Sequence, residues 1–134
     1  MRSFAPPVSA SDYQAAAELR SALRRFLRRS EEIARRHSLT PRQYLLLLTI
    51  KAREETPGQT TITDLVERLA LTQSTVTELV QRAQDAGLIS RRTSTEDGRV
   101  VHLSITPLGD ERFQAAFDEL GPERQALLRI VRAD

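Results

Sequence analysis

The stretch from residue 61 to residue 106 constrains the fold more than any other part of the chain, because its hydrophobic period changes from helical to strand-like. Two short helical patterns come first, and two strand patterns joined by a polar turn follow them. This order is typical of a helix-turn-helix with a wing, an arrangement that fits the grooves of duplex DNA.

Capping residues and apolar faces define the two helices of this stretch. Thr61 and Asp64 form a capping pattern for the first helix, and Thr72 caps the second, which we expect to run to about Ala86 and end at Gly87. The inward face of the first helix consists of Ile62, Leu65, Val66 and Leu69. The inward face of the second consists of Val76, Leu79, Val80 and Ala83. The opposite side of the second helix is therefore polar and faces outward.

The strand patterns cover Leu88 to Thr93 and Arg99 to Ile105, and the polar turn between them ends in Gly98. In the second strand, apolar residues alternate with His102 and Ser104, as in a half-buried strand.

Helical patterns flank this stretch on both sides. A first helix is predicted from Ser11 or Asp12, and a second, apolar on nearly every face, begins at Thr40-Pro41. Thr106-Pro107 caps a further helix, and a last one spans Glu123 to Arg132. The first helix carries an apolar stripe of Leu19, Leu23, Phe26, Leu27 and Ile33. The predicted fold class is mostly α with a small β-hairpin, in a single domain over residues 1–134.

Composition narrows the function classes. The 134-residue chain has no cysteine, so disulfides, cysteine-ligated zinc and thiol redox sensing are excluded. His37 and His102 are its only histidines and lie in no metal-ligand spacing, and phosphate loops and nucleophile elbows are lacking. We therefore predict no catalysis, no metal and no cofactor. No apolar run reaches a membrane span, and the N-terminus lacks a signal-peptide pattern, so we expect no membrane partner and a cytoplasmic location.

The outward side of the second helix carries groups suited to reading base edges. Gln73, Ser74, Thr75 and Thr77 lie near its N-terminus. Glutamine bonds adenine bidentately, and threonine offers a hydroxyl and a methyl group that contacts thymine. The alternative is a surface helix whose serine and threonine residues only cap it and contact water.

The arginines in the hairpin favour a DNA-binding function. Arg91, Arg92 and Arg99 lie at its base and tip, and Asp97 is spaced to hold the Arg99 guanidinium, which then enters a minor groove. Arg82, Arg91 and Arg92 are predicted phosphate contacts. The alternative is that Asp97 and Arg99 only stiffen a surface hairpin. Glu78, on the same side as the polar residues, opposes DNA binding, because phosphates repel a carboxylate that does not accept from cytosine N4 or turn aside.

These motifs resemble those of the MarR family of bacterial transcriptional regulators. Asp97 to Thr106, DGRVVHLSIT, is similar to the wing signature of that family, and Leu71 to Thr77, LTQSTVT, to its recognition helix. Leu39-Thr40-Pro41 and Thr106-Pro107-Leu108-Gly109 resemble the flanking helix starts, so that the likeness covers about residues 12 to 133. The chain departs from the family at Gly98, where a second wing arginine is frequent, at Glu78, often basic, and at Ala83, usually leucine.

The resemblance implies a homodimer that binds double-stranded operator DNA, with residues 11–37 and 107–133 as dimerisation helices and 40–106 as the DNA-binding winged helix. Apolar surface on the outer helices independently favours two-fold pairing. Family habit implies a repressor, relieved by a small aromatic effector in a cleft lined by Phe26, His37, Tyr44 and Phe113. The interpretation of these four residues as ordinary core is the stronger of the two.

Two other functions remain open at this point. A protein–protein adaptor that retains the winged helix without binding DNA is consistent with Glu78 and with the modest formal net charge of +2. A small-molecule-binding protein without a role on DNA is the third.

Overall fold

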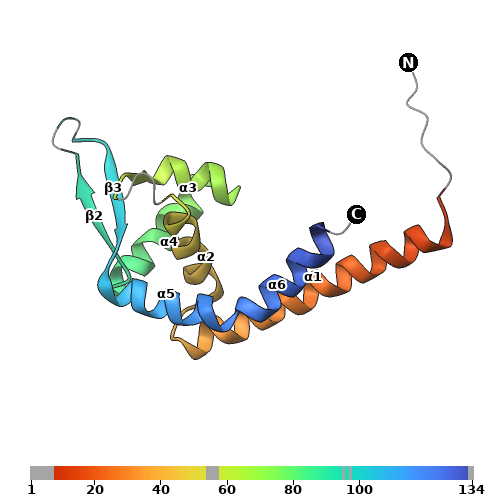
Figure 1. Cartoon of the computed structure of the whole chain (residues 1–134). Helices are drawn as coiled ribbons and strands as arrows, with labels where there is room; N and C mark the ends of the chain where they lie inside the picture. Colours follow the sequence, from red (N-terminus) through yellow and green to blue (C-terminus); the bar gives the residue numbers. More distant parts are fainter. Residues whose placement is uncertain (1–7, 54–57, 95, 97, 133–134) are drawn as a thin grey trace, which may run out of the picture.

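The computed structural model describes residues 8–53, 58–94, 96 and 98–132. Its elements confirm the predicted order of helices and hairpin and add one short strand (Figure 1). In chain order they are α1 (Ala10–Arg36), α2 (Pro41–Lys51), β1 (Thr60–Thr61), α3 (Ile62–Leu69), α4 (Gln73–Asp85), β2 (Ile89–Thr93), β3 (Val101–Ile105), α5 (Pro107–Glu119) and α6 (Gly121–Arg132).

The predicted capping residues begin the helices. Thr40 and Gln43 form a capping box at α2, and Thr61 and Asp64 form another at α3. The hydroxyl groups of Thr72 and Thr106 accept from backbone N–H groups at the starts of α4 and α5. Each cap satisfies an amide that the helix leaves without a partner, and so the local sequence determines where these helices begin.

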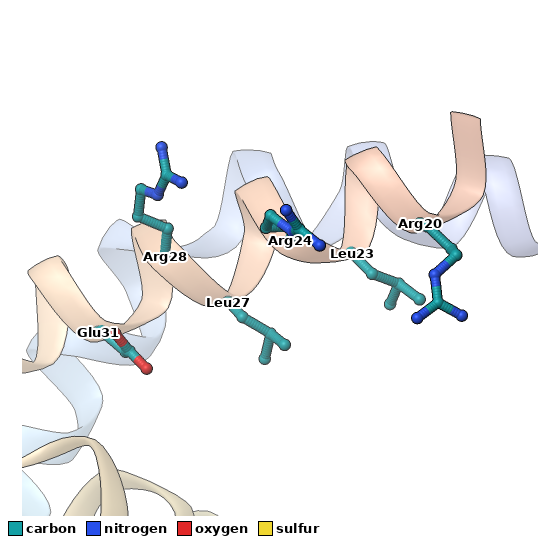
Figure 2. A pocket seen from close by; sticks show the side chains of 6 residues that line it. All are labelled: Arg20, Leu23, Arg24, Leu27, Arg28 and Glu31. Carbon is teal, nitrogen blue, oxygen red and sulfur yellow. The ribbon is translucent and has the colours of Figure 1, made fainter. Parts of the chain in front are cut away.

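The long α1 lies beside α6 and extends away from the winged helix, which occupies the other end of the molecule (Figure 1). The apolar stripe predicted on α1 divides into two parts. Ile33 is buried, whereas Leu19, Leu23 and Leu27 are 37%, 40% and 58% exposed. Leu23 and Leu27 project from α1 among Arg20, Arg24, Arg28 and Glu31 (Figure 2). Within the described chain, this part of the stripe therefore remains uncovered.

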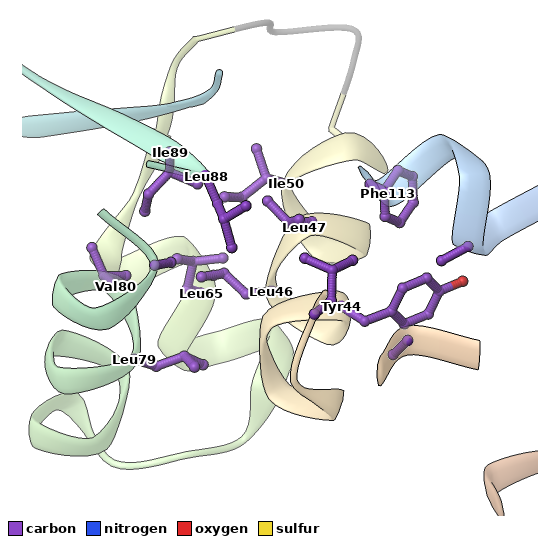
Figure 3. Packing of buried hydrophobic residues seen from close by; sticks show 14 of the residues in the cluster. Tyr44, Leu46, Leu47, Ile50, Leu65, Leu79, Val80, Leu88, Ile89 and Phe113 are labelled. Atoms are coloured by element: carbon purple, nitrogen blue, oxygen red, sulfur yellow. The ribbon is translucent and has the colours of Figure 1, made fainter. Parts of the chain in front are cut away.

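The core lies around α2, which contacts α1, α3, α4, α5 and β3. Leu46 and Leu47 are fully buried, and Leu65 of α3, Val80 of α4 and Leu88 pack in the same cluster (Figure 3). The sequence predicted burial on nearly every face of α2, and Leu45 is an exception at 44% exposed. The core therefore joins the helix pair α3–α4, the sheet and the outer helices through one central helix.

The sheet has three strands in the order β1-β3-β2, all antiparallel. The predicted hairpin is confirmed as β2 and β3, although β3 begins at Val101 and not at Arg99. The short β1 was not predicted. Its Thr60 pairs with Leu103 and is 1% exposed. Because β1 is only two residues long, it has no alternating pattern to detect, and its position depends on the free edge of β3.

The start of α5 packs directly on the backbone that leads into β2. The Thr106 hydroxyl donates to the Gly87 carbonyl at 2.6 Å and accepts from the Gly109 amide at 3.0 Å. A Cβ atom added at Gly109 would lie 2.1 Å from the Leu88 carbonyl oxygen. Only glycine therefore permits this approach, which joins the wing to the outer helices.

We predict that Gly109→Ala lowers the free energy of unfolding by about 3 kcal/mol or more, because the rigid backbone at Leu88 must shift. Chemical denaturation with circular dichroism measures the change. Gly121→Ala is the matched control, since an added Cβ there meets no atom closer than the Arg124 guanidinium at 3.7 Å. Equal stability of the two variants would contradict the proposed contact.

Candidate nucleic-acid interface

A turn with one left-handed residue sets α4 against α3. Ala70 has φ 54° and ψ 39° at the C-terminus of α3, and Thr72 then caps α4. The left-handed conformation costs a residue with a Cβ atom roughly 1–2 kcal/mol. Burial of α4 outweighs this cost, because Val76 and Val80 are fully buried and each such side chain contributes roughly 1.5–3 kcal/mol.

The outward side of α4 is polar and exposed, as predicted. Gln73, Ser74 and Thr77 are exposed, and they line an open hollow together with Glu78 and Gln81. Thr75 differs from its neighbours, since it is half-buried and the Thr72 hydroxyl donates to its hydroxyl at 2.8 Å. Its side chain is therefore tied to the helix cap, unlike the exposed Ser74 and Thr77.

One ion pair and two further hydrogen bonds organise the far half of this surface. Arg82 donates to Glu78 at 2.7 Å, so the carboxylate that opposes DNA binding has a cation beside it. Arg91 of β2 donates to Gln81 at 3.4 Å, and Gln81 donates to Asp85 at 2.9 Å. Gln81 is not among the residues predicted from the sequence to contact DNA. In the structure it connects the helix with the wing.

The wing brings Arg91 next to this helix. Arg91 and Arg92 are neighbours on β2 and both are exposed, and Arg99 is exposed near the tip. Asp97 lies outside the described residues, so the predicted Asp97–Arg99 pair stays a prediction. The surface formed by α4, β2 and the tip thus combines neutral polar groups and cations, which suit base edges flanked by phosphates, with the carboxylates of Glu78 and Asp85.

The four residues predicted to line an effector cleft lie in different surroundings. Tyr44 and Phe113 stack in the core with ring centroids 5.4 Å apart, and they are only 7% and 2% exposed. Burial raises the pKa of the Tyr44 hydroxyl. Phe26 lines a groove between α1 and α6, and His37 contacts α5. The prediction of one cleft remains untested, but two of its residues serve the core.

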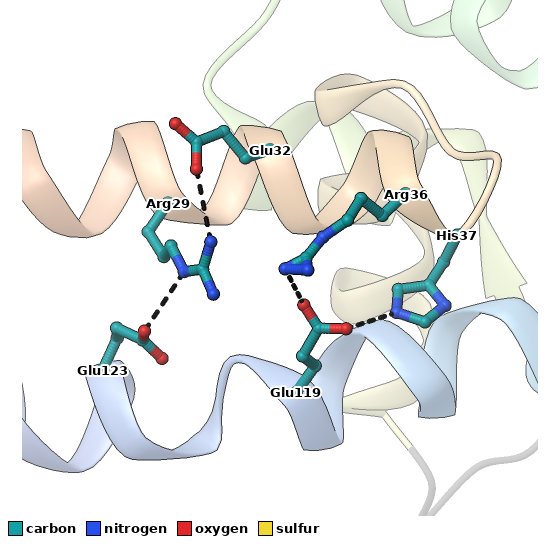
Figure 4. A network of polar contacts seen from close by, with 6 residues as sticks. All are labelled: Arg29, Glu32, Arg36, His37, Glu119 and Glu123. Carbon is teal, nitrogen blue, oxygen red and sulfur yellow. Dashed lines mark hydrogen bonds and ion pairs between the residues drawn. The ribbon is translucent and has the colours of Figure 1, made fainter.

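His37 belongs to a polar network between α1 and α5 (Figure 4). Its Nε2 atom lies 3.0 Å from one carboxylate oxygen of Glu119, and Arg36 pairs with the other at 2.6 Å. The hydrogen bond from His37, supported by the charge of Arg36, lowers the pKa of the Glu119 carboxyl. Two turns toward the N-terminus of α1, Arg29 bridges Glu123 and Glu32, and these carboxylates raise the pKa of its guanidinium.

The described residues include no group of three or more histidine, cysteine, aspartate or glutamate side chains able to hold a metal ion. None of the described helices has the length and apolar character needed to cross a membrane.

Sequence comparison identifies the same part of the chain. The sequence model of the MarR family matches residues 37–100, which include α2, α3, α4 and β2. The chain belongs to the MarR family. Members of the MarR family are transcription regulators and not enzymes.

Three similar proteins illustrate the relation to other MarR-family members. The chain is 31% identical over 83 residues to the HTH-type transcriptional repressor MdtR of Bacillus subtilis, an alignment covering 62% of this chain. That alignment covers 51% of MdtR, so this chain matches about half the length of that relative. A crystal structure of a MarR family transcription regulator is 29% identical with a TM-score of 0.72, covering 87% of this chain and 74% of that one.

The third is a variant of MepR from S. aureus bound to an oligodeoxyribonucleotide. It is 20% identical with a TM-score of 0.70, and the match covers 84% of this chain and 80% of that chain. At this identity the likeness concerns the fold alone. The structures therefore support the mostly helical winged-helix fold expected for the MarR family.

We predict that Glu119→Gln reduces the dependence of stability on acidic pH. A carboxyl whose pKa is lowered by folding stabilises the protein above its unfolded pKa of 4.5, and that contribution is lost as the pH falls through the folded pKa. The variant should be less stable than wild type near neutral pH, and the difference should shrink on acidification. Thermal unfolding between about pH 3 and about pH 7 measures this.

Glu111→Gln is the matched control, since Glu111 is an exposed glutamate on the same helix. It should retain the wild-type pH profile. A constant stability difference between wild type and Glu119→Gln at every pH would contradict the assignment.

Proposed function

We propose that this protein is a sequence-specific regulator of transcription that binds double-stranded operator DNA. The observation that carries the proposal is that Arg91 of β2 lies next to the exposed polar side of α4, where it donates a hydrogen bond to Gln81. Gln73, Ser74 and Thr77 meet base edges in the major groove, with Thr75 behind them at the cap. Arg82, Arg91 and Arg92 meet phosphates, and Arg99, oriented by Asp97, enters the minor groove.

The protein acts as a homodimer in the cytoplasm, where the operator DNA is. Residues 11–37 and 107–133 form the dimerisation helices, and residues 40–106 form the DNA-binding winged helix. Uncovered apolar side chains on the outer helices support this division, because Leu23 and Leu27 on α1 and Val131 on α6 are 40%, 58% and 60% exposed. Two-fold pairing covers such a surface and sets two winged helices at a fixed spacing on a pseudo-palindromic site.

Repression is the mode of regulation that we favour, because MdtR is named as a repressor. Relief by a small aromatic ligand would involve the region of Phe26 and His37, where α1 meets α6 and α5. Tyr44 and Phe113 would then act from the core, as the floor beneath such a ligand.

A winged-helix adaptor that binds a protein and not DNA is the competing function. Glu78 favours it, since a carboxylate on the outward side of α4 opposes phosphate. The ion pair with Arg82 reduces this repulsion between Glu78 and phosphate, because the guanidinium offsets the charge of the carboxylate.

Titration of the protein into mixed duplex DNA at rising salt distinguishes the two functions. A DNA-binding protein should lose affinity steeply as salt rises, because arginine–phosphate contacts release counterions, whereas an adaptor should show no such binding. On a selected operator, Arg99→Ala should weaken binding by roughly 1–3 kcal/mol. Arg42→Ala, an equal change of charge at an exposed position on α2, is the control. Equal losses in the two variants would argue against the wing contact.

We predict that the double variant Leu23→Glu, Leu27→Glu is monomeric. Glutamates at these exposed positions leave the monomer folded but place like charges across a two-fold interface. Sedimentation measures the mass, and affinity for a duplex with two half-sites should fall on the order of 100-fold as the second contact is lost. Leu45→Glu, at an exposed leucine of α2, is the matched control. A dimeric double variant would place the interface elsewhere.

A further inference from the structure

The carboxylate of Glu78 is the acidic group among the five side chains that line the hollow on α4. Its neighbours there, Gln73, Ser74, Thr77 and Gln81, carry hydroxyl and amide groups that either donate or accept hydrogen bonds. An ionised carboxylate only accepts. Glu78 is therefore the member of this surface with the narrowest choice of partner.

The major-groove edges of the bases differ in what they offer such an acceptor. Guanine presents two acceptors, and thymine presents an acceptor and a methyl group, so both repel a carboxylate or leave it without a partner. Adenine presents a donor beside the N7 acceptor, which suits an amide better than a carboxylate. Cytosine presents only its N4 amino group, a donor. A carboxylate on a base-reading surface thus selects cytosine.

The ion pair with Arg82 makes this contact compatible with a polyanion. Arg82 donates to one carboxylate oxygen of Glu78, Oε1, at 2.7 Å, and this leaves Oε2 as a further acceptor. The side chains of Arg82 and Glu78 are 73% and 63% exposed. Pairs this exposed restrain their side chains weakly, so Glu78 turns toward a base at little cost while Arg82 offsets its charge near the phosphates.

We propose that Glu78 is a specificity-determining residue, which accepts a hydrogen bond from cytosine N4 and requires a C·G base pair at one position of each operator half-site. This inference rests on the proposed function, because it concerns the base contacts of the same surface. Glu78 therefore contributes to base recognition and does not simply weaken DNA binding.

Selection of bound sequences from a random duplex library tests it, with wild type, Glu78→Gln, Glu78→Ala and Asp85→Asn compared. Wild-type protein should require a C·G pair at one half-site position, and replacing that pair should weaken its binding roughly 5- to 150-fold. Glu78→Gln should change the preference to A·T, because an amide bonds adenine bidentately. Glu78→Ala should show no preference at that position.

Asp85→Asn is the matched control, since it removes the same charge from the same helix outside the residues that line the hollow. Asp85→Asn should keep the wild-type preference for C·G. Like Glu78→Gln, it removes a negative charge and should therefore raise the affinity for DNA of any sequence. A C·G preference retained by Glu78→Gln and Glu78→Ala would overturn this inference and leave the proposed function intact. Wild-type protein that bound no duplex would overturn both.

Discussion

Burial of α2 at the centre of the molecule is the interaction on which the remaining structure depends. Its buried side chains, Tyr44, Leu46, Leu47 and Ile50, contact the outer helices on one side and the winged helix on the other. In both directions α2 is a neighbour of several elements, namely α1 and α5 on one side and α3, α4 and β3 on the other. Because interiors are close-packed, a movement of α2 on one side changes the packing on the other. The winged helix and the outer helices are therefore mechanically coupled through α2, in addition to the direct contact of α5 with the Leu88 backbone.

Attachment of α4 to this core gives its outward side a defined orientation. Val76 and Val80 anchor the helix, and their burial exceeds the cost of the left-handed turn at Ala70. The wing is held from two directions, since α5 packs on the Leu88 backbone and Arg91 contacts Gln81. A base-reading helix and its wing need this fixed relation, because both grooves of a duplex must be met at once.

Charges in this protein serve two separate purposes. Between the outer helices, Glu119 and Glu123 pair with cations on α1 and hold the long arm of the molecule together. On α4, the Arg82–Glu78 pair instead remains exposed and weakly restrained. The formal net charge of +2 counts the whole chain, so it does not measure how basic the surface near α4 and β2 is.

The sequence by itself determined the helices, the capped starts of α2, α3, α4 and α5, and the inward side of α4, because caps and apolar periodicity act over a few residues. It also indicated the polar side of α4 and the arginines of β2. Only the tertiary structure decided which apolar residues are covered: Ile33 is buried while Leu27, on the same helix, is exposed. It likewise added β1, the left-handed Ala70, the Arg91–Gln81 bond and the partners of Glu119. These features join residues far apart in the chain or depend on a neighbouring element, and no local pattern records such a relation.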